Sequence, residues 1–349
     1  FNDIDGKKTK VGNKQLADEI VNGSKAGRWY ADSVKRDTSV SRPHPPFTTS
    51  TMQQDGASKL NLTPAQVMQL AQQLYEGVDI PGMGHTALVT YIRTDSTRVS
   101  SDAQNEALAY IRSNFGDNYA PVRPNVYKAK SGAQDAHEAI RPISLAMTPE
   151  SLKDKLQRSM YKLYKLIYDR FVASQMAPAL FDTLTVHVNS VSDKVYGYVH
   201  KGKTHKFNGW QAAYMPAGEG EEKSGKALPD IKEGETFILK EMKAEQKFTT
   251  PPARFTDATL VKGMEDNGIG KPSTYAATIA VISKRDYIEK DGKSIRPTEL
   301  GETVCDMLVK YFPNIMDVKF TSDMEMDLDR VEGGGVKWEK IISVFYPGF

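Results

Sequence analysis

The sequence predicts a multidomain α+β protein, and two observations lead to this interpretation. The spacing of apolar residues changes along the chain from an extended or period-two pattern to helical spacing, then back to period two, then to helical spacing again. In addition, 349 residues are enough for two or three ordinary domains, each with its own core. Because two β-rich blocks flank a helical block, we expect one β-rich domain with a helical domain inserted into it, followed by a mostly helical domain.

The domain boundaries are expected where proline interrupts the pattern. Residues 1–50 and 178–250 would form the β-rich domain, residues 51–177 the inserted helical domain, and residues 251–349 the last domain. Proline forces the preceding backbone to be extended and stops helices. The prolines near the expected boundaries are Pro43, Pro45, Pro46, Pro178, Pro251 and Pro252.

Helical spacing is clear in three stretches of the inserted block. A helix opens with Thr63 as its cap and Pro64 in its first turn, and it ends at Gly77. A second helix starts at Ser101, which has capping-box spacing to a glutamine three residues later. A third helix spans about 150–177, with apolar residues on one wide stripe.

The two flanking blocks are expected to be extended or to form strands. Residues 1–50 are expected to be extended or β, because they mix charge with Gly, Ser and Pro. From residue 180 to 248, alternating apolar residues indicate strands in LTVHV, VYGYVH and TFILKEM. A loop rich in Gly, Glu and Lys at 217–227 would separate the last two strands.

Residues 256–298 predict a winged helix-turn-helix. Thr256 or Asp257 would cap a helix that ends near Asp266, and NGIGKPS forms a tight turn into a second helix running from Pro272 to about Arg285. The segment YIEKDGKSIRPT then reads as a hairpin around its Asp-Gly pair. A helix, a short glycine turn, a helix and a hairpin are the elements of that motif.

The charge pattern indicates a local surface for phosphate rather than a general one. The chain carries 46 Lys+Arg against 44 Asp+Glu, a net charge of +2, so any nucleic-acid contact must be a local groove. The second helix and hairpin supply a local excess of basic residues: Lys271, Lys284, Arg285, Lys290, Lys293 and Arg296. A packing module with solvated lysines is the alternative interpretation of this region.

Composition limits the other classes of protein. The single cysteine, Cys305, excludes an internal disulfide framework and a cysteine-rich zinc module. No apolar run approaches the roughly 20 residues needed to cross a bilayer, and no signal-peptide pattern opens the sequence, so we expect an intracellular protein.

Two clusters contain candidate catalytic residues. In VTYIRTDS, period-two alternation puts Tyr91 and Arg93 on one face of a strand, where a guanidinium beside the phenol stabilises the phenolate and holds a phosphate. In QDAHEAIRP, a helix would put His137 and Arg141 on one face as a second phosphate clamp. From these residues alone, a purely structural role for Tyr91 and for His137 stays open.

Several blocks of the sequence resemble bacterial type IA DNA topoisomerase I, in the same order as in that family. The matching blocks are PPFTTSTMQQDGASKL, LAQQLYEG, TALVTYIRTDSTRVS, AHEAIRP, LYKLIYDRFVASQMAPA, PPARFTDATLVKGMEDNGIGKPSTYAATIAVISKRDYI and RPTELGETV. The resemblance covers nearly the whole chain from about residue 40.

The resemblance implies a reaction and the residues that perform it. In that family, the tyrosine that matches Tyr91 attacks a single-strand DNA phosphate and forms a 5′-phosphotyrosine, and the arginine that matches Arg93 neutralises the phosphate. The ester retains the free energy of the broken bond, so ATP is not required for resealing. By the same resemblance, the expected DNA-binding residues are Asp95, His137, Arg141, Lys271, Ser273 and Thr274.

The resemblance also implies an architecture and partners. The β-rich domain would be the arch that carries the hinge, and the whole would form an open clamp on single-stranded or negatively supercoiled DNA. Mg²⁺ and a catalytic glutamate belong to a TOPRIM domain, whose motifs are absent from this sequence. We therefore expect a monomeric, cytoplasmic and nucleoid-associated enzyme of which this chain is a piece that binds single strands, holds no metal and is inactive alone.

The acidic stretch DMEMDLD is the one place that resembles a metal motif. Its acidic residues alternate, but no apolar strand precedes it, and it matches a helix in the family. We expect it to be a solvated helix face rather than a metal site.

Other interpretations stay open at this point. A non-catalytic winged-helix DNA-binding protein would leave Tyr91 structural. A tyrosine recombinase is disfavoured because His137 and Arg141 follow the tyrosine instead of preceding it. Topoisomerase III usually has proline where this chain has Ile92, and reverse gyrase would add a helicase part.

Overall fold

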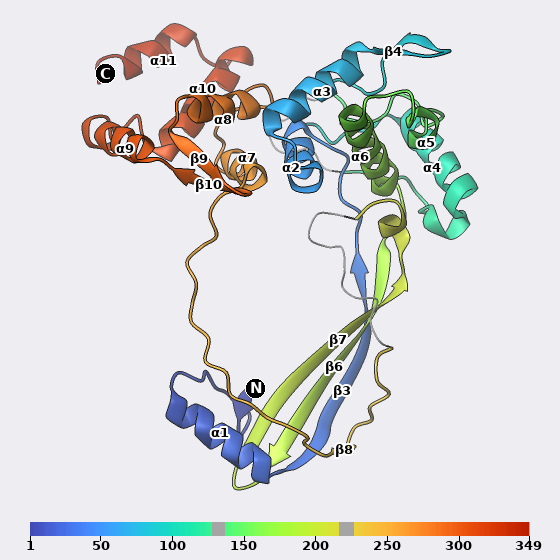
Figure 1. The fold of residues 1–349 in the computed structure, drawn as a ribbon, viewed down its shortest axis with the longest axis vertical. Helices are drawn as coiled ribbons and strands as arrows, with labels where there is room; N and C mark the ends of the chain where they lie inside the picture. Colours follow the sequence, from blue (N-terminus) through green and yellow to red (C-terminus); the bar gives the residue numbers. More distant parts are fainter. Residues whose placement is uncertain (128–136, 216–226, 349) are drawn as a thin grey trace. The chain divides into compact units, whose positions relative to one another are not determined.

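The computed structural model describes residues 1–127, 137–215 and 227–348. Within these ranges the chain forms eleven α-helices and ten β-strands, and its largest sheet is antiparallel (Figure 1). The expected mixture of helices and β-structure is confirmed. The chain divides into two compact units. The division into three domains with boundaries near 50, 178 and 250 stays a prediction.

The first unit contains a six-stranded sheet with the strand order β2-β1-β7-β6-β3-β8. The long strands β3 and β6 pair along their whole length, from Arg28 opposite Val191 to Ser41 opposite Ala179. Segments that precede and follow the helical block therefore share one sheet. The elements of this unit are β1 (Asp3–Ile4), β2 (Lys7–Lys8), α1 (Lys14–Ala26), β3 (Arg28–Ser41), β6 (Ala179–Val191), β7 (Val195–Phe207), the 3₁₀ turn η2 (Gly209–Ala212) and β8 (Thr236–Phe237).

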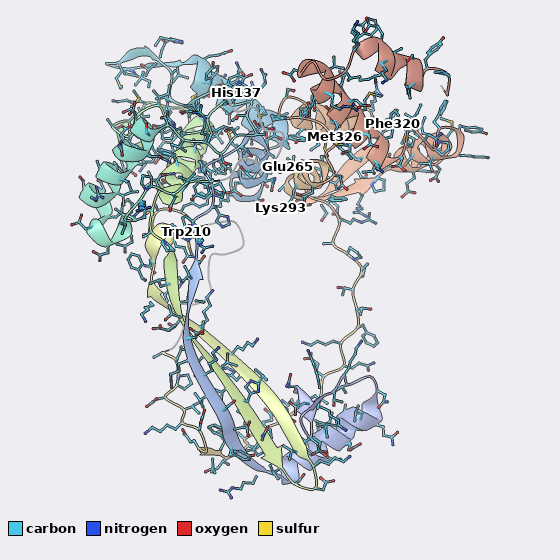
Figure 2. The ribbon with its side chains drawn as sticks, turned by 180° about the vertical axis from the view of Figure 1, so that it is seen from behind. His137, Trp210, Glu265, Lys293, Phe320 and Met326 are labelled. Atoms are coloured by element: carbon cyan, nitrogen blue, oxygen red, sulfur yellow. The ribbon has the colours of Figure 1, made fainter. Side chains whose placement is uncertain are left out.

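Alternation along the strands explains the core of this unit. Leu184 and Val186 are buried on one face of β6, while His187, the residue after Val186, is exposed to solvent. Together with Ala31 of β3 they form an apolar cluster. Where the sheet ends, the buried Trp210 donates a hydrogen bond from its indole nitrogen to the Ser41 carbonyl, at 2.9 Å (Figure 2).

Two expectations for this unit are corrected. Residues 14–26 form helix α1, where we expected only extended structure, and the Asn13 side chain caps it by accepting from a backbone N–H. The helix was missed because polar and charged residues dominate it, and it buries only Ile20 and Ser24. The strand expected in TFILKEM is reduced to β8 at Thr236–Phe237. The loop expected at 217–227 lies, apart from Ala227, outside the described residues.

The second unit begins with helices that pack around α6. Eleven residues of α6 are buried, more than in any other described helix, and α6 contacts α2, α3 and α5. The helix expected after Thr63 is confirmed, with a capping box between Thr63 and Gln66. The elements are α2 (Thr49–Leu60), α3 (Pro64–Glu76), β4 (Val78–Ile80), β5 (Gly84–Thr86), α4 (Ser101–Phe115), the 3₁₀ turn η1 (Asp117–Tyr119), α5 (Pro149–Leu152) and α6 (Arg158–Ser174).

The predictions for three other helices of this part differ from the structure. Helix α2 was not predicted as an element, because its polar residues give no clear apolar stripe. The single helix expected over 150–177 is two helices, with a break after Leu152. The cap of α4 is Ser100 instead of Ser101, since the Ser100 hydroxyl accepts from the Ala103 N–H.

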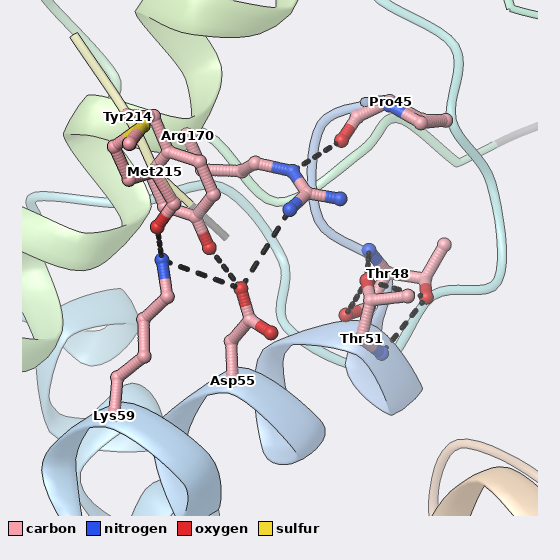
Figure 3. A network of polar contacts seen from close by, with 8 residues as sticks. All are labelled: Pro45, Thr48, Thr51, Asp55, Lys59, Arg170, Tyr214 and Met215. Atoms are coloured by element: carbon pink, nitrogen blue, oxygen red, sulfur yellow. Dashed lines mark hydrogen bonds and ion pairs between the residues drawn. The ribbon is translucent and has the colours of Figure 1, made fainter. Parts of the chain in front are cut away.

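A buried polar network joins α6 to α2 inside the second unit (Figure 3). Arg170 of α6 donates to the Pro45 carbonyl at 2.6 Å and lies 3.6 Å from the Asp55 carboxylate of α2. The Tyr214 hydroxyl donates to the same carboxylate, and Lys59 lies above the Tyr214 ring. Arg170 also lies over the Tyr214 ring, so it contacts the chain both before and after residues 51–177, inside the second unit.

The C-terminal part of the second unit has the element order expected from the sequence. Thr256 caps α7, a turn leads into α8, and a hairpin follows around Asp291 and Gly292. Helix α8 begins at Tyr275, three residues later than expected. The acidic stretch lies in a helix, α10, as expected. The elements are α7 (Asp257–Asp266), α8 (Tyr275–Lys284), β9 (Ile288–Asp291), β10 (Ser294–Pro297), α9 (Glu299–Tyr311), α10 (Val318–Glu332) and α11 (Trp338–Phe345).

None of the helices in the described ranges is both long enough and apolar enough to cross a membrane.

Candidate active site

The segment that carries Tyr91 is extended but is not a strand. Among the described residues, its β-pairing is limited to an isolated bridge between Val89 and Pro142. Residues 91–100 form no helix or strand. The expected strand is therefore wrong, whereas the expected alternation holds: Ile92 is buried, while Arg93 on the other side is exposed. Extended backbone alone gives period two, so the side chains of the two candidate residues, Tyr91 and Arg93, still lie on one side and line one cavity.

Helix α2 holds this segment in place through Thr49. The Thr49 hydroxyl donates to the Ile92 carbonyl at 2.6 Å and accepts from the Thr94 N–H at 2.9 Å. The Thr49 N–H also donates to the Thr94 carbonyl, at 2.9 Å. Because Thr49 is fully buried, these bonds are shielded from water and fix the backbone on both sides of Arg93.

The segment that carries His137 runs beside the Tyr91 segment. The Thr90 N–H donates to the Arg141 carbonyl at 3.0 Å, and the Thr90 hydroxyl donates to the Ala139 carbonyl at 2.8 Å. The helix expected here is wrong, because residues 137–148 form no helix. The segment uses its backbone groups for bonds to the Tyr91 segment, so His137 and Arg141 do not share a helix face.

Tyr91 lies between two other rings. The His137 ring centroid is 5.3 Å from that of Tyr91, and the Tyr75 ring from α3 is 5.5 Å away in an edge-on arrangement (His137 is labelled in Figure 2). Such pairs contribute about 0.5–1.5 kcal/mol beyond the area they bury. The two rings restrict the phenol to a narrow range of orientations.

Tyr91, Arg93, Asp95 and His137 line one cavity of about 740 Å³ inside the second unit. The turn before α8 and the C-terminal half of α10 complete its wall. These regions contribute Lys271, Pro272, Ser273, Glu325, Leu328, Asp329, Glu332 and Gly333. Six of the eight residues predicted to act in catalysis or DNA binding therefore meet at one place, although they come from three separate stretches of sequence.

The two remaining predicted residues lie outside the lining of this cavity. The Arg141 guanidinium donates to the Glu138 carboxylate at 2.8 Å and to the Pro142 carbonyl at 3.1 Å. The Thr274 hydroxyl accepts from the Lys271 N–H at 2.8 Å, so it stabilises the turn before α8. Their roles in DNA binding stay predictions.

Three polar side chains of the cavity form no hydrogen bond or ion pair with other described residues. Within the described ranges, no hydrogen bond or ion pair involves the Tyr91 hydroxyl, the Arg93 guanidinium or the Asp95 carboxylate. Arg141, four residues beyond His137, is by contrast fully engaged with Glu138. These polar groups line the cavity, so they can bind a ligand that enters it.

Carboxylates outnumber cations among the described residues of the lining. Asp95, Glu325, Asp329 and Glu332 face Arg93 and Lys271, and the Lys271 ammonium lies 2.8 Å from Asp329. Burial, together with the carboxylates of Glu265, Asp95 and Glu325, raises the pKa of nearby Tyr275 to about 12. That phenol stays protonated at neutral pH.

Among the described residues, no cluster of three or more His, Cys, Asp or Glu side chains is arranged to hold a metal ion.

Sequence reasoning missed the residues that hold the site and those that face it from α10. The bonds of Thr49 and Thr90 connect distant segments, so no local pattern reveals them. A signal did exist for α10: Glu325, Asp329 and Glu332 are spaced by four and three residues, which puts three carboxylates on one helix face.

Comparisons with known proteins show what this chain is similar to. A sequence-family model described as DNA topoisomerase matches residues 2–343. Among solved structures, full-length topoisomerase I from Thermotoga maritima is similar, with 36% sequence identity and a TM-score of 0.84. The match covers 99% of this chain and 55% of the T. maritima chain, so this chain spans about half the length of that protein.

Proposed function

The chain belongs to the DNA topoisomerase family, and from this premise we propose that it carries the nucleophile of a type IA enzyme, Tyr91. The predicted resemblance to bacterial topoisomerase I is confirmed. The observation that supports the proposal is the convergence of Tyr91, Arg93 and His137 on one cavity with the turn that opens α8.

The proposed reaction is a transesterification at a DNA phosphate. The Tyr91 oxygen attacks phosphorus and loses its proton, the bond from phosphorus to the 3′ oxygen breaks, and that oxygen leaves as a hydroxyl after taking up a proton. One phosphodiester replaces another, so the reverse attack by the 3′ hydroxyl reseals the strand without ATP. A tyrosine phenol has a pKa near 10 and needs nearby positive charge to act as a nucleophile.

Arg93 supplies that positive charge in the proposal. It is exposed and makes no ion pair within the described ranges, so its guanidinium is available to bind two phosphate oxygens at once. The backbone around it is held by Thr49, so the guanidinium does not need to be positioned anew when DNA enters. His137 packs on Tyr91 and limits the rotation of the phenol.

We further propose that α7, α8 and the hairpin β9–β10 form a winged helix that guides a single strand to the cavity. Lys271 and Ser273 line the cavity at the turn that opens α8. There, the positive end of the α8 dipole favours an anion. The path supplies phosphate contacts rather than base contacts, so binding should depend little on sequence.

The remaining chemistry is assigned to a part of the enzyme outside this chain. We propose that a TOPRIM domain carries the Mg²⁺ site and the glutamate that protonates the leaving 3′ oxygen. The whole enzyme would relax negatively supercoiled DNA as a monomer in the cytoplasm, at the nucleoid. This chain alone should bind single strands and leave them intact.

The test is cleavage in trans. This chain is mixed with a separately expressed TOPRIM-containing piece, Mg²⁺, and single-stranded oligonucleotides labelled at the 5′ or the 3′ end. The proposal predicts a covalent adduct on a denaturing gel that retains only the 3′ label. Tyr91→Phe should abolish the adduct, and Tyr75→Phe, which alters the neighbouring ring, should retain it.

Three outcomes would contradict the proposal. An adduct that retains the 5′ label would indicate a 3′-phosphotyrosine, the linkage formed by tyrosine recombinases. An adduct that survives Tyr91→Phe would place the nucleophile elsewhere. A mixture that binds the oligonucleotide and forms no adduct would favour a DNA-binding protein in which Tyr91 is structural.

A further inference from the structure

Lys271 is already bound to an anion within the protein. Its ammonium contacts both oxygens of Asp329, at 3.0 and 2.8 Å, although the two residues are 58 positions apart in the sequence. Both side chains line the cavity that contains Tyr91. The cation predicted to meet DNA at this edge is thus held by a carboxylate from α10.

The carboxylates of α10 differ in the cavities they face. Glu325, Asp329 and Glu332 lie on one face of the helix and line the Tyr91 cavity. Asp327 pairs with Arg330 at 2.9 Å, and both line a different cavity between α10 and α11. Within the first set, Asp329 contacts a cation of the proposed DNA site, Lys271.

A carboxylate and a phosphate compete for the same position on an ammonium group, because each presents oxygens near 2.8 Å to its N–H donors. We propose that Asp329 occupies the place on Lys271 that a DNA phosphate takes over, and that Asp329 sets the affinity of the site for single-stranded DNA. This inference rests on the proposed function, since it assumes that DNA enters the Tyr91 cavity. In free protein Asp329 acts as a positioning residue that holds Lys271 at the cavity wall.

Two further features favour such an exchange. The side chains of Lys271 and Asp329 are 42% and 49% exposed, and ion pairs of this kind are weak in water. Helix α10 buries none of its residues and ends at Gly333, followed by two more glycines. A helix with so few buried contacts can shift at a small cost, so the carboxylates can move away when phosphates arrive.

The proposal is tested by the affinity of the 349-residue chain for a short fluorescein-labelled oligothymidylate. Asp329→Asn should tighten binding about three- to tenfold at moderate salt, because one competing charge is removed. Asp327→Asn removes the same charge from the same helix at a position that faces the other cavity, and it should change binding less than about twofold. Asp329→Glu keeps the charge and should restore the affinity of the unmodified chain.

A second variant pair separates this inference from the proposed function. Lys271→Gln should weaken binding, and in the Lys271→Gln chain the further change Asp329→Asn should have little effect, because the competitor acts through Lys271. If Lys271→Gln leaves binding unchanged, the proposed DNA site is wrong.

Two other results overturn only the inference about Asp329. If Lys271→Gln weakens binding while Asp329→Asn and Asp327→Asn tighten it equally, the effect is general charge and not competition. If Asp329→Asn weakens binding, Asp329 supports the site instead of competing for it. Circular dichroism of each variant checks that the exposed substitutions leave the fold intact.

Discussion

Hydrogen bonds from neighbouring residues, and not regular secondary structure, fix the position of Tyr91 and Arg93. Thr49 bonds to the backbone at Ile92 and Thr94, while Thr90 joins the Tyr91 segment to the segment that carries His137. Each of these threonines uses a hydroxyl to satisfy backbone groups that a strand partner would otherwise satisfy. Irregular backbone is possible at the site because these bonds are made.

The first prediction concerns the buried hydroxyl of Thr49. Thr49→Val keeps the shape of the side chain but leaves the Ile92 carbonyl and the Thr94 N–H without this partner, which should cost about 1–3 kcal/mol of unfolding free energy. Adduct formation in the trans cleavage assay should also fall, because Arg93 is no longer held. Urea denaturation and the gel assay measure the two effects.

Thr49→Ser is the matched control, because it retains the hydroxyl and removes one methyl group. It should keep adduct formation close to that of the unmodified chain. Equal losses of cleavage in the valine and serine variants would show that packing of the methyl group, and not the hydrogen bond, holds the segment.

At the scale of elements, α6 organises the part of the second unit that bears Tyr91. Its buried face packs on α2 and α3, and α2 in turn holds the Tyr91 segment. Arg170 adds polar contacts, because it donates to the Pro45 carbonyl and pairs with the Asp55 carboxylate (Figure 3). Burial raises the pKa of Tyr214, which donates to Asp55, so the network contains a protonated phenol at neutral pH.

The second prediction compares two cations on α6. Arg170→Met leaves the Asp55 carboxylate half-buried without its arginine and should reduce the unfolding free energy by about 3–5 kcal/mol. The Arg170 side chain is only 8% exposed, so water cannot replace it easily. Chemical denaturation of the variant measures the loss.

Lys165→Met provides the comparison on the same helix. Lys165 pairs with Asp169 at 2.8 Å, but its side chain is 44% exposed, so its loss should cost no more than about 1 kcal/mol. A similar cost for the two variants would mean that the Arg170 network does not contribute to the stability of the unit.

At the scale of the whole molecule, the charge balance limits how the proposed DNA contacts can form. A net charge of +2 gives no general attraction to a polyanion, so contacts must come from a few local cations. Among the described residues that line the Tyr91 cavity, Arg93 and Lys271 are the permanent cations. The acidic residues of α10 reduce their effect further.

The third prediction follows from this count. Each phosphate neutralised on a single strand contributes a slope of about −0.7 to the plot of log affinity against log salt. Two or three such contacts predict a slope of about −1.5 to −2 for oligothymidylate binding to this chain. Fluorescence anisotropy over a series of salt concentrations measures it, and a slope steeper than about −5 would indicate a much larger basic surface.

Local patterns in the sequence were sufficient for many elements. The helices after Thr63 and Thr256, the hairpin around Asp291-Gly292 and the alternation at Tyr91 depend on caps, turn residues and periodicity, which neighbouring residues determine. Helix α2 was missed because its residues show no clear apolar stripe, and helix α1 was missed although Leu16 and Ile20 have helical spacing. Both are stabilised by contacts with distant parts of the chain.

The sequence by itself determined the family and six of the eight predicted residues that meet in one cavity. Only the tertiary structure decided that the Tyr91 segment is not a strand, that Arg141 is bound to Glu138 outside the cavity lining, and that Asp329 reaches Lys271. The physical reason is the separation of the residues along the sequence. Propensities and caps act within about one turn of a helix, whereas these tertiary contacts form only when the chain is folded.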